Sequence, residues 1–552
     1  MQVIRYDYYH NRALAGQLKQ YEIPAERGTI RISNGDSTVP LVLNQKLFTI
    51  YADPSLVRDA DHVADKLALT FGMDRKTMLE KVTAKDTRYS VLAKKVTVEQ
   101  KAVVLQYKFA GIGAQEQTYR TYPQGAMAAQ LLGIVDDSGT GRYGIEQALN
   151  KELAGRAGEL KAVTDINGVP LAANSDNVLV SPKAGSDITL TLDAGIQKQL
   201  ETTIAARAEE FKAERVSAVI MEANTGAIKG MANYPSYDPA QSGNVEDSTL
   251  FNNAAVSHPI EVGSIMKSLT TAAALDSGAV KENVSYHDPA SYTVDEFRIT
   301  NIEEDGGPGT KNLYDLLNLS LNTGATWLLM QMGGGRINEE ARNTWYSYLS
   351  DHYRLGKETG IEQGYEDPGY VPEPKDTGAG INLTYANTSF GQAMTATPLQ
   401  MAAAFSGVIN GGTYYQPRLV AATENNQGET AMTKPKVLRE GVVNPGVSAS
   451  LAKMLQYAVD NHYFAKKFDQ SRYMVGGKTG TAEVALPSGG YSKTQFNGTY
   501  LGFVGGDTPQ YVICVYVIKP TVRGYAGSGA AQPIFGDLSH MLINGSYVSP
   551  KN

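Results

Sequence analysis

The sequence has 552 residues, which is too long for one domain with a single core, so at least two domains are expected. Its 42% of hydrophobic and 19% of charged residues are typical of a folded globular protein and exclude a disordered or fibrous chain. The net charge of -7 is small and spread along the chain, which argues against a nucleic acid or an anionic membrane surface as a partner.

The lone cysteine, Cys514, cannot form a disulfide within the chain. It lies in the apolar run YVICVYVI, and we interpret it as a small core residue without chemistry. No run of 18 or more apolar residues is found, and the first stretch, MQVIRYDYYHNRALAGQLKQ, is too polar for a signal peptide. We therefore expect the chain as given to be soluble.

Residues 1 to about 180 alternate strand-like runs with polar helical stretches, which predicts an extended α+β region without a dominant core. The strand-like runs are TVPLVL, LFTIYA and KAVVLQYKF, and RDADHVADKLALTFG is predicted to be helical. The turn-rich stretch DINGVPLAANSDNVLVSPKAGSD ends this region. We place the domain boundary there, which gives domains at residues 1–184 and 185–552.

The second domain begins with a predicted strand and a long helix with Asp193 as its N-cap. A hairpin follows in SAVIMEANTGAIKGMANY, where residues 224–226 form the turn. A second hairpin, TYLGFVGGDTPQYVICVYVIKP, lies near the C-terminus, directly after the predicted strand YMVGGKTGTAEV. Strands at both ends and a helical middle predict one mixed domain in which early and late strands share a sheet covered by helices.

Ser264 and Lys267 are three residues apart in SIMKSLTTAAALDSG, a run of good helix formers that ends before Gly278. Apolar residues on nearly every face predict a buried helix, with the serine and the lysine on one face. Burial of a lysine disfavours its charged form, so Lys267 could accept a proton from Ser264. A serine in the first turn also lies near free backbone N–H groups, which favour an oxyanion.

The SxxK spacing alone is a weak signal, because SLAK from Ser450 to Lys453 has the same spacing. We expect that copy to be an ordinary helix with an exposed lysine. The SxN motif that a serine–lysine acyltransferase also requires occurs three times, at Ser175, Ser242 and Ser320. Taken singly, none of the three is informative.

The third motif, KTG, occurs once, as Lys478–Gly480 in a predicted strand. Only one set has the order SxxK, SxN, KTG within the second domain: Ser264 with Lys267, Ser320 with Asn322, and then this strand. An isolated KTG would be interpreted as a turn with a surface lysine. As the third member of an ordered set, it instead indicates a serine acyltransferase.

With these motifs the chain resembles the class B penicillin-binding proteins, the membrane-anchored peptidoglycan D,D-transpeptidases. In the first domain, PAERGTI, LFTIYADP, RTYPQGAMAAQLLG, GRYGIEQALNKELAGRAG and DINGVPL look like segments of the family's N-terminal pedestal. In the second, SFGQAMTATPLQMAAAFSGVINGGTYYQPRLV and GAAQPIF are similar to family segments. The chain departs at Ile32 and Ser33, where the family often has an acidic–basic pair, and at Val262, where it often has proline. The resemblance implies an α+β pedestal, then an α/β transpeptidase domain with an antiparallel sheet covered by helices and an all-helical subregion.

The resemblance also implies roles for the first two motifs. Ser264 would attack the penultimate carbonyl of a stem peptide ending in D-Ala-D-Ala, form an acyl-enzyme and release D-alanine. Lys267 would accept the serine proton. Ser320 would relay a proton to the leaving amine, and the amide of Asn322 would hold the substrate backbone.

In the third motif, Lys478 would supply positive potential and Thr479 would bind the terminal carboxylate. Gly480 would let the peptide lie along the strand. The oxyanion hole would consist of the backbone N–H groups of Ser264 and Thr481. An amine from a second stem peptide would then complete the cross-link, without a metal or an organic cofactor.

The family further implies inhibition by β-lactams, a polytopic membrane glycan polymerase as partner, and one N-terminal membrane anchor that is absent from this sequence. The catalytic domain would then lie at the outer face of the cytoplasmic membrane. Family relatives can bind zinc, but SYHDPASYTVDEFRITNIEEDGG offers only His287 with acidic residues. We interpret that segment as a solvated loop.

Two other functions are alternatives to a transpeptidase, and the first of them uses the same three motifs. A β-lactam hydrolase or sensor is one, although the pedestal-like first domain and the absence of a recognisable deacylation motif favour slow deacylation. A non-catalytic cell-wall scaffold with a decayed site is the other, and the intact motif set argues against it.

Overall fold

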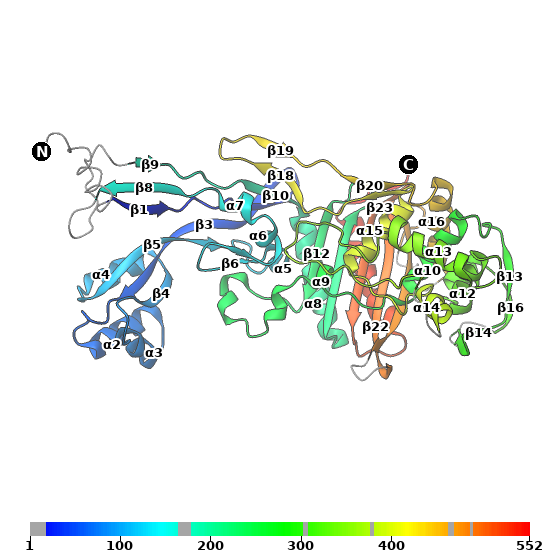
Figure 1. Ribbon diagram of the computed structural model, residues 1–552, viewed down its shortest axis with the longest axis horizontal. Helices are drawn as coiled ribbons and strands as arrows, with labels where there is room; N and C mark the ends of the chain where they lie inside the picture. The colour runs from blue at the N-terminus through cyan, green and yellow to red at the C-terminus, as the bar shows by residue number, and fades with distance from the viewer. Residues whose placement is uncertain (1–17, 164–177, 302–306, 376–379, 462–467, 486–489) are drawn as a thin grey trace, which may run out of the picture. The chain divides into compact units, whose positions relative to one another are not determined.

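The structure is a computed structural model that describes residues 18–163, 178–301, 307–375, 380–461, 468–485 and 490–552 (Figure 1). The chain forms two compact units. The first contains the described residues up to Ile30, Pro40–Pro123 and Glu152–Ser186, and the second contains Arg31–Val39, Gln124–Lys151 and Asp187–Asn552. The last change from the first unit to the second occurs between Ser186 and Asp187, next to the boundary placed at residue 185. The two early segments that belong to the second unit, Arg31–Val39 and Gln124–Lys151, have no signal in the sequence.

The predicted turn-rich stretch lies largely outside the described residues, and so do DINGVPL and the SxN copy at Ser175. Around that gap the first unit forms an antiparallel sheet in the order β1-β8-β9. Its strands are β1 (Leu18–Ile23), β8 (Gly158–Val163) and β9 (Val178–Val180). Among the described residues, every helix of the chain is too short or too polar to span a lipid bilayer.

The first unit has a core of its own, so the expectation of a region without a dominant core is wrong. One long strand, β3 (Ser37–Ala52), contains both TVPLVL and LFTIYA and pairs with β4 (Ser90–Val96) and β5 (Ile112–Thr121). Alternate β3 residues at 48, 50 and 52 point to one face, where they pack on the predicted helix α2 (Ala60–Phe71) and on α3 (Arg75–Val82).

The run KAVVLQYKF was expected to be a strand, but most of it lies in helix α4 (Val98–Gln106). A capping box starts this helix: the Thr97 hydroxyl accepts from the backbone N–H of Gln100, and the Gln100 side chain accepts from the backbone N–H of Thr97. The β-branched residues that suggested a strand are a weaker determinant than this cap and the packing of Val104 in the core.

The second unit is built on a five-stranded antiparallel sheet in the order β12-β11-β23-β22-β21. This confirms that the two predicted hairpins and the KTG strand share one sheet. The strands are β11 (Arg215–Glu222), β12 (Ile228–Tyr234), β21 (Met474–Ala485), β22 (Tyr491–Gly505) and β23 (Pro509–Ile518). Cys514 is fully buried in β23, as predicted, and burial raises the pKa of its thiol.

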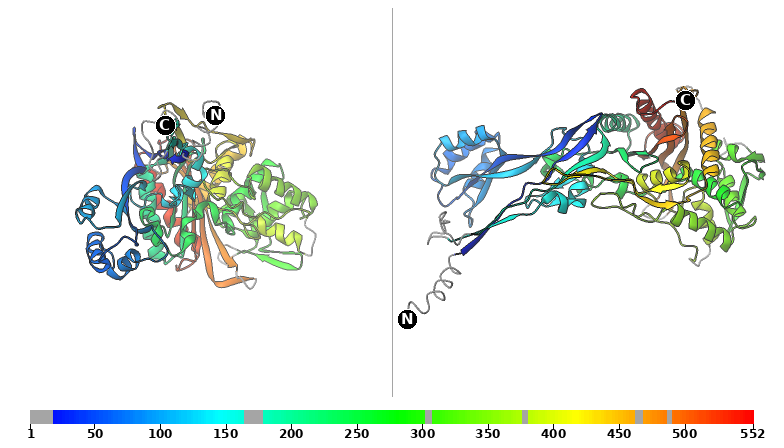
Figure 2. Two further views of the ribbon diagram at one scale, coloured as in Figure 1. Left: turned by 60° about the vertical axis from the view of Figure 1, so that its left-hand side comes forward. Right: turned by 90° about the horizontal axis from the view of Figure 1, so that it is seen from above.

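Helices cover both faces of this sheet, which explains why its strands are buried almost continuously. On one face, α8 (Ala194–Phe211) and α17 (Gln532–Asn544) share a core with it, and Tyr500 stacks on Phe535 at 4.2 Å. Asp193 caps α8 as predicted. On the other face lies α15 (Pro398–Ile409), whose Phe405 ring is 6.4 Å from that of Phe503. The left view of Figure 2 shows the orange strands of this sheet beside the green and yellow helices.

The green part of the second unit in Figure 1 is mainly helical. It contains α11 (Leu313–Asn318), α12 (Asn322–Gln331), α13 (Glu339–Ser347) and α14 (Ile381–Thr388). The segment interpreted as a solvated loop is instead largely structured in β13 (Ser285–Asp288), β14 (Ser291–Val294) and β15 (Phe297–Thr300), although residues 302–306 of it are not described.

That interpretation is wrong because two side chains of β13 are anchored in the helical part. Tyr286 stacks on Trp327 with ring centroids 4.2 Å apart, and Asp288 is buried. His287 between them is exposed. Within the described ranges, no group of three or more histidine, cysteine, aspartate or glutamate side chains could hold a metal ion.

Candidate active site

The nucleophile candidate lies at the entrance to a buried helix, as predicted. Residues Gly263–Ile265 form the single 3-10 turn η3, and α10 (Met266–Asp276) follows it directly. Every residue of α10 from position 266 to 274 is buried, because alanine, leucine, threonine and serine pack on all of its sides. Ser264 therefore stands where the chain enters the core, and Lys267 stands one turn deeper.

The amino group of Lys267 joins the first two motifs. Its Nζ atom donates to Ser264 Oγ at 2.9 Å, to Ser320 Oγ at 3.2 Å and to the backbone carbonyl of Ser320. The lysine is fully buried, so these oxygens stand in for its water shell. A neutral amine at this position can accept the Ser264 proton while it still donates to the carbonyl.

Ser320 is held in an unusual backbone conformation that brings it to the lysine. Its φ of 60° lies in the left-handed region that residues other than glycine rarely adopt. It forms the turn between α11 and α12, and this turn directs both its hydroxyl and its carbonyl to Lys267. Such strain is typical of functional sites, where the surrounding structure holds it in place.

Asn322 is the first residue of α12, and its side-chain amide donates to the carbonyl of Thr300 at 3.1 Å. The next residue, Thr323, anchors the start of the helix: its hydroxyl donates to Asp288 at 2.6 Å, and its backbone N–H donates to Asn301 at 3.0 Å. Sequence reasoning missed these anchors because Asp288 and Asn301 were assigned to a solvated loop. The partners lie 22 and 35 positions from Thr323 in the sequence, so no local pattern indicated them.

The KTG residues lie in β21, which is the edge strand of the sheet. Lys478 is 3% exposed, and its Nζ atom donates to the Thr479 carbonyl at 3.0 Å and lies 3.4 Å from the Thr479 hydroxyl. Thr479 and Thr481 remain partly exposed. An edge strand leaves one row of backbone groups without a strand partner.

Gly480 allows β21 to approach the nucleophile turn closely. A Cβ atom at this position would lie 3.0 Å from the Val262 carbonyl oxygen and 3.1 Å from the Ile265 nitrogen, and it would overlap the Thr499 hydroxyl. Thr499 in turn donates to the Val262 carbonyl at 2.8 Å. The third motif is thus brought to the first by backbone packing, and the space left by the missing side chain is filled by the protein itself.

The same contact continues on the other side of the turn. Gly263 has φ 64°, and a Cβ on it would lie 2.8 Å from the Thr481 carbonyl oxygen. Its N–H donates to the carbonyl of Gly391 at 2.9 Å. The residue before Ser264 therefore has to be glycine, both for its conformation and for its close contact with the Thr481 backbone.

Glu261, three residues before the nucleophile, was not found by sequence reasoning. One of its carboxylate oxygens accepts from the backbone N–H of Ala393 and from the Tyr491 hydroxyl, each at 2.8 Å. Burial raises the pKa of this carboxyl, and the two hydrogen bonds oppose that shift. The contact joins residues 230 positions apart, so no local pattern could have indicated it.

Two motif copies outside the ordered set lie in the described part of the chain, and both behave as ordinary structure. Lys453 is exposed on α16 (Pro445–Asp460), and Ser450 on the same helix donates to Glu282 at 2.6 Å, which confirms the expected ordinary helix. Ser242 lies in η1 (Pro239–Asn244), a different element from those that supply Ser264, Lys267 and Ser320. Position in the chain, more than spacing, separates the site from its copies.

Comparison with protein families agrees with this geometry. Residues 216–540 match the model described as the penicillin binding protein transpeptidase domain, and this match covers more than half of the chain. The chain belongs to the penicillin-binding proteins. Residues 22–190 of this penicillin-binding protein match the penicillin-binding protein dimerisation domain, and the combination of the two domains makes it a class B member.

Individual relatives span most of this penicillin-binding protein. It is 28% identical over 530 residues to stage V sporulation protein D of Bacillus subtilis, a match that covers 95% of this chain and 79% of the relative. It is 25% identical over 557 residues to peptidoglycan D,D-transpeptidase FtsI of Escherichia coli K12, covering 100% and 89% of the two chains. Penicillin-binding protein 3 of Mycobacterium tuberculosis, solved in complex with aztreonam, shares the fold with a TM-score of 0.71 at 24% identity, covering 96% and 98%.

Proposed function

We propose that this class B penicillin-binding protein is a peptidoglycan D,D-transpeptidase that works through an acyl-enzyme on Ser264. The observation that carries the proposal is the buried Lys267 amino group, which lies within hydrogen-bond distance of both Ser264 Oγ and Ser320 Oγ. The Lys267 nitrogen can thus accept the proton of Ser264 and form a hydrogen bond with the Ser320 hydroxyl. A base that contacts both the nucleophile and a proton relay is what acyl transfer requires.

In the acylation step, Ser264 Oγ attacks the penultimate carbonyl carbon of a D-Ala-D-Ala stem peptide while Lys267 accepts the hydroxyl proton. The tetrahedral intermediate collapses as the C–N bond breaks, and a proton passes through Ser320 to the leaving D-alanine amine. We assign the oxyanion to the backbone N–H groups of Ser264 and Thr481, whose residues lie side by side at the η3–β21 contact.

For substrate binding we propose that the donor peptide lies along the edge strand β21. The Thr479 hydroxyl would bind the terminal carboxylate, and the Lys478 charge beneath it would favour that anion. The amide of Asn322 would hold the peptide backbone from the opposite side. The amine of a second stem peptide then attacks the acyl carbonyl, forms the cross-link and returns the proton to the site.

A β-lactam would acylate Ser264 in the same way, and the relative solved with aztreonam supports this reading. Slow deacylation would distinguish a transpeptidase from a β-lactam hydrolase. We further propose that the catalytic domain works outside the cytoplasmic membrane and that residues 22–190 take part in contact with a membrane glycan polymerase. The match of those residues to the dimerisation domain supports a binding role for this part of the chain.

The test is intact-mass analysis after incubation with penicillin, followed by peptide mapping. We expect one adduct on the peptide that contains Ser264, and none in Ser264→Ala. Ser450→Ala, which alters the second SxxK copy, should label like the wild type. A label on another residue would overturn the mechanism, and rapid loss of the adduct with turnover would favour a hydrolase. A Ser264→Ala variant that still acylated or still supported cross-linking would favour a scaffold.

A further inference from the structure

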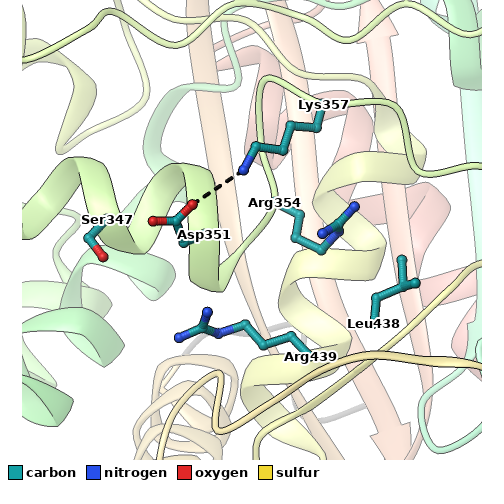
Figure 3. A pocket seen from close by; sticks show the side chains of 6 residues that line it. All are labelled: Ser347, Asp351, Arg354, Lys357, Leu438 and Arg439. Atoms are coloured by element: carbon teal, nitrogen blue, oxygen red, sulfur yellow. Dashed lines mark hydrogen bonds and ion pairs between the residues drawn. The ribbon is translucent and has the colours of Figure 1, made fainter.

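A positively charged pocket lies in the second unit, on elements other than those that carry the three motifs (Figure 3). Its volume is about 260 Å³, and it is formed by the end of α13, by η5 (Tyr348–His352) with the turn after it, and by β20 (Val437–Glu440). The side chains that line it are Ser347, Asp351, Arg354, Lys357, Leu438 and Arg439. Three cations against one carboxylate leave a lining charge of +2.

The two arginines of this pocket lack an anionic partner within the described ranges. The Nε atoms of Arg354 and Arg439 are buried there without a hydrogen-bond acceptor. The ion pair drawn in Figure 3 joins Lys357 to Asp351 at 3.3 Å, and both of these side chains are largely exposed. An exposed pair of this kind is weak, whereas a buried Nε–H group without an acceptor is costly. The charge arrangement therefore favours a bound anion.

The pocket is preorganised around one aromatic ring. Arg354 has φ 55°, a left-handed conformation, and the backbone bonds from Tyr353 to Tyr348 and from Leu355 to Leu349 fix the turn on both sides of it. Its guanidinium lies 5.8 Å from the centre of the Tyr414 ring. In the strand pair of β17 (Thr413–Tyr415) and β20, Tyr414 is the register partner of Arg439. Both arginines are thus positioned before any ligand arrives.

We propose that this pocket binds a phosphate group. A lining charge of +2 matches a phosphate dianion, and guanidinium forks pair with phosphate oxygens through two parallel hydrogen bonds. The volume is several times the roughly 30 Å³ that one water occupies, so the group esterified to the phosphate also fits. Two kinds of molecule could supply this phosphate group: a soluble molecule such as a glycerol-phosphate polymer, or the headgroup of a lipid.

Calorimetric titration of the full chain with inorganic phosphate, at constant ionic strength in chloride, tests the proposal. We expect saturable binding that weakens at least tenfold in Arg439→Gln and in Arg354→Gln. Arg336→Gln removes the same charge from an exposed position of the same unit and should bind like the wild type. Penicillin acylation of each variant shows that it is folded. Equal phosphate affinity in the wild type and Arg439→Gln, or no saturable binding, would overturn the proposal.

Two further arms distinguish the source of the phosphate. The first arm measures whether the protein sediments with lipid vesicles. If it sediments with phosphatidic acid vesicles but not with phosphatidylcholine vesicles, and Arg439→Gln no longer does so, the phosphate belongs to a lipid headgroup. The second arm measures whether a soluble glycerol-phosphate polymer competes with inorganic phosphate for binding to the protein. Competition that is lost in Arg439→Gln would show that the phosphate belongs to such a polymer. Retention of vesicle or polymer binding in both arginine variants would contradict the assignment of phosphate recognition to this pocket.

Discussion

The amino nitrogen of Lys267 lies 2.9 Å from the hydroxyl oxygen of Ser264, a distance at which a proton can pass directly between them. Both residues belong to one continuous segment, η3 followed by α10. The lysine is fully buried, so helix geometry and packing fix the pair. The base is therefore built into the same helix as the nucleophile.

Lys267→Ala removes this base and should slow acylation by penicillin by about 10²- to 10⁴-fold, the usual contribution of general base catalysis. The rate is measured with a fluorescent penicillin under single-turnover conditions. Lys453→Ala in the second SxxK copy is the matched control, because its lysine is exposed on α16 and should leave the rate unchanged. Near wild-type acylation by Lys267→Ala would exclude the lysine as the base.

Gly480→Ala should impair both folding and acylation. The added methyl group would press on the Val262 carbonyl and the Thr499 hydroxyl, and overpacking of this kind costs about 1–3 kcal/mol. Urea unfolding and the acylation rate measure the two effects. Gly243→Ala is the control, since no atom lies within 4 Å of its Cβ position, and it should change the free energy of unfolding by about 0.5 kcal/mol or less. A fully stable and active Gly480→Ala would contradict the close approach of β21 to η3.

Local sequence signals predicted the parts of the fold that local interactions determine. The turn at residues 224–226, the Asp193 cap and the apolar faces of α10 each act within a few residues, and the structure confirms the elements that they indicate. The ordered motifs predicted which serine meets Lys267, since the SxN residue Ser320 lies beside it. The prediction of a strand over the KAVVLQYKF run was wrong, because the helix cap at Thr97 is a stronger determinant of structure there than the strand preference of the valines.

Contacts between distant segments could not be predicted in the same way. Glu261 meets Tyr491, and Asp288 meets Thr323, through side chains that no periodicity or spacing connects. The polar composition around Asp288 suggested a solvated loop, but its carboxylate is buried and accepts a hydrogen bond from Thr323. Tertiary packing thus determines the supports of the site, whereas the motifs indicate only the groups that act in it.

Thr323→Val should destabilise the second unit by about 1–3 kcal/mol, because it leaves the buried Asp288 carboxylate without the hydroxyl that donates to it. Acylation should also slow, since this bond anchors the first turn of α12 beside Ser320. Urea unfolding and the acylation rate are the measurements. Thr326→Val is a close control: it is equally buried on the same helix, but its hydroxyl donates only to the Asn322 carbonyl of the preceding turn. Equal losses in the two variants would contradict a specific role for the Thr323–Asp288 bond.

The Glu261 carboxyl should make the protein more stable at acidic pH than at neutral pH. Burial raises its pKa in the folded state, and the hydrogen bonds from Tyr491 and Ala393 offset only part of this effect. The folded state therefore binds the proton more tightly than the unfolded chain, in which a glutamate has a pKa of about 4.3. Stability from this group is present below the unfolded value and is lost as the pH rises through the folded pKa.

Glu261→Gln removes that titration while it keeps an oxygen that can accept from both donors. Urea unfolding between about pH 4 and pH 7.5 should show the wild type gaining stability relative to Glu261→Gln as the pH falls, because the buried carboxylate becomes protonated. Glu340→Gln on α13 removes an exposed carboxyl and controls for the loss of one negative charge from the same unit. If the difference between the wild type and Glu261→Gln stays constant over this range, or grows in favour of the wild type at high pH, burial does not control the ionisation of Glu261. The carboxyl would then be held as an anion by its two donors, and its contact with Tyr491 would be a charged rather than a neutral hydrogen bond.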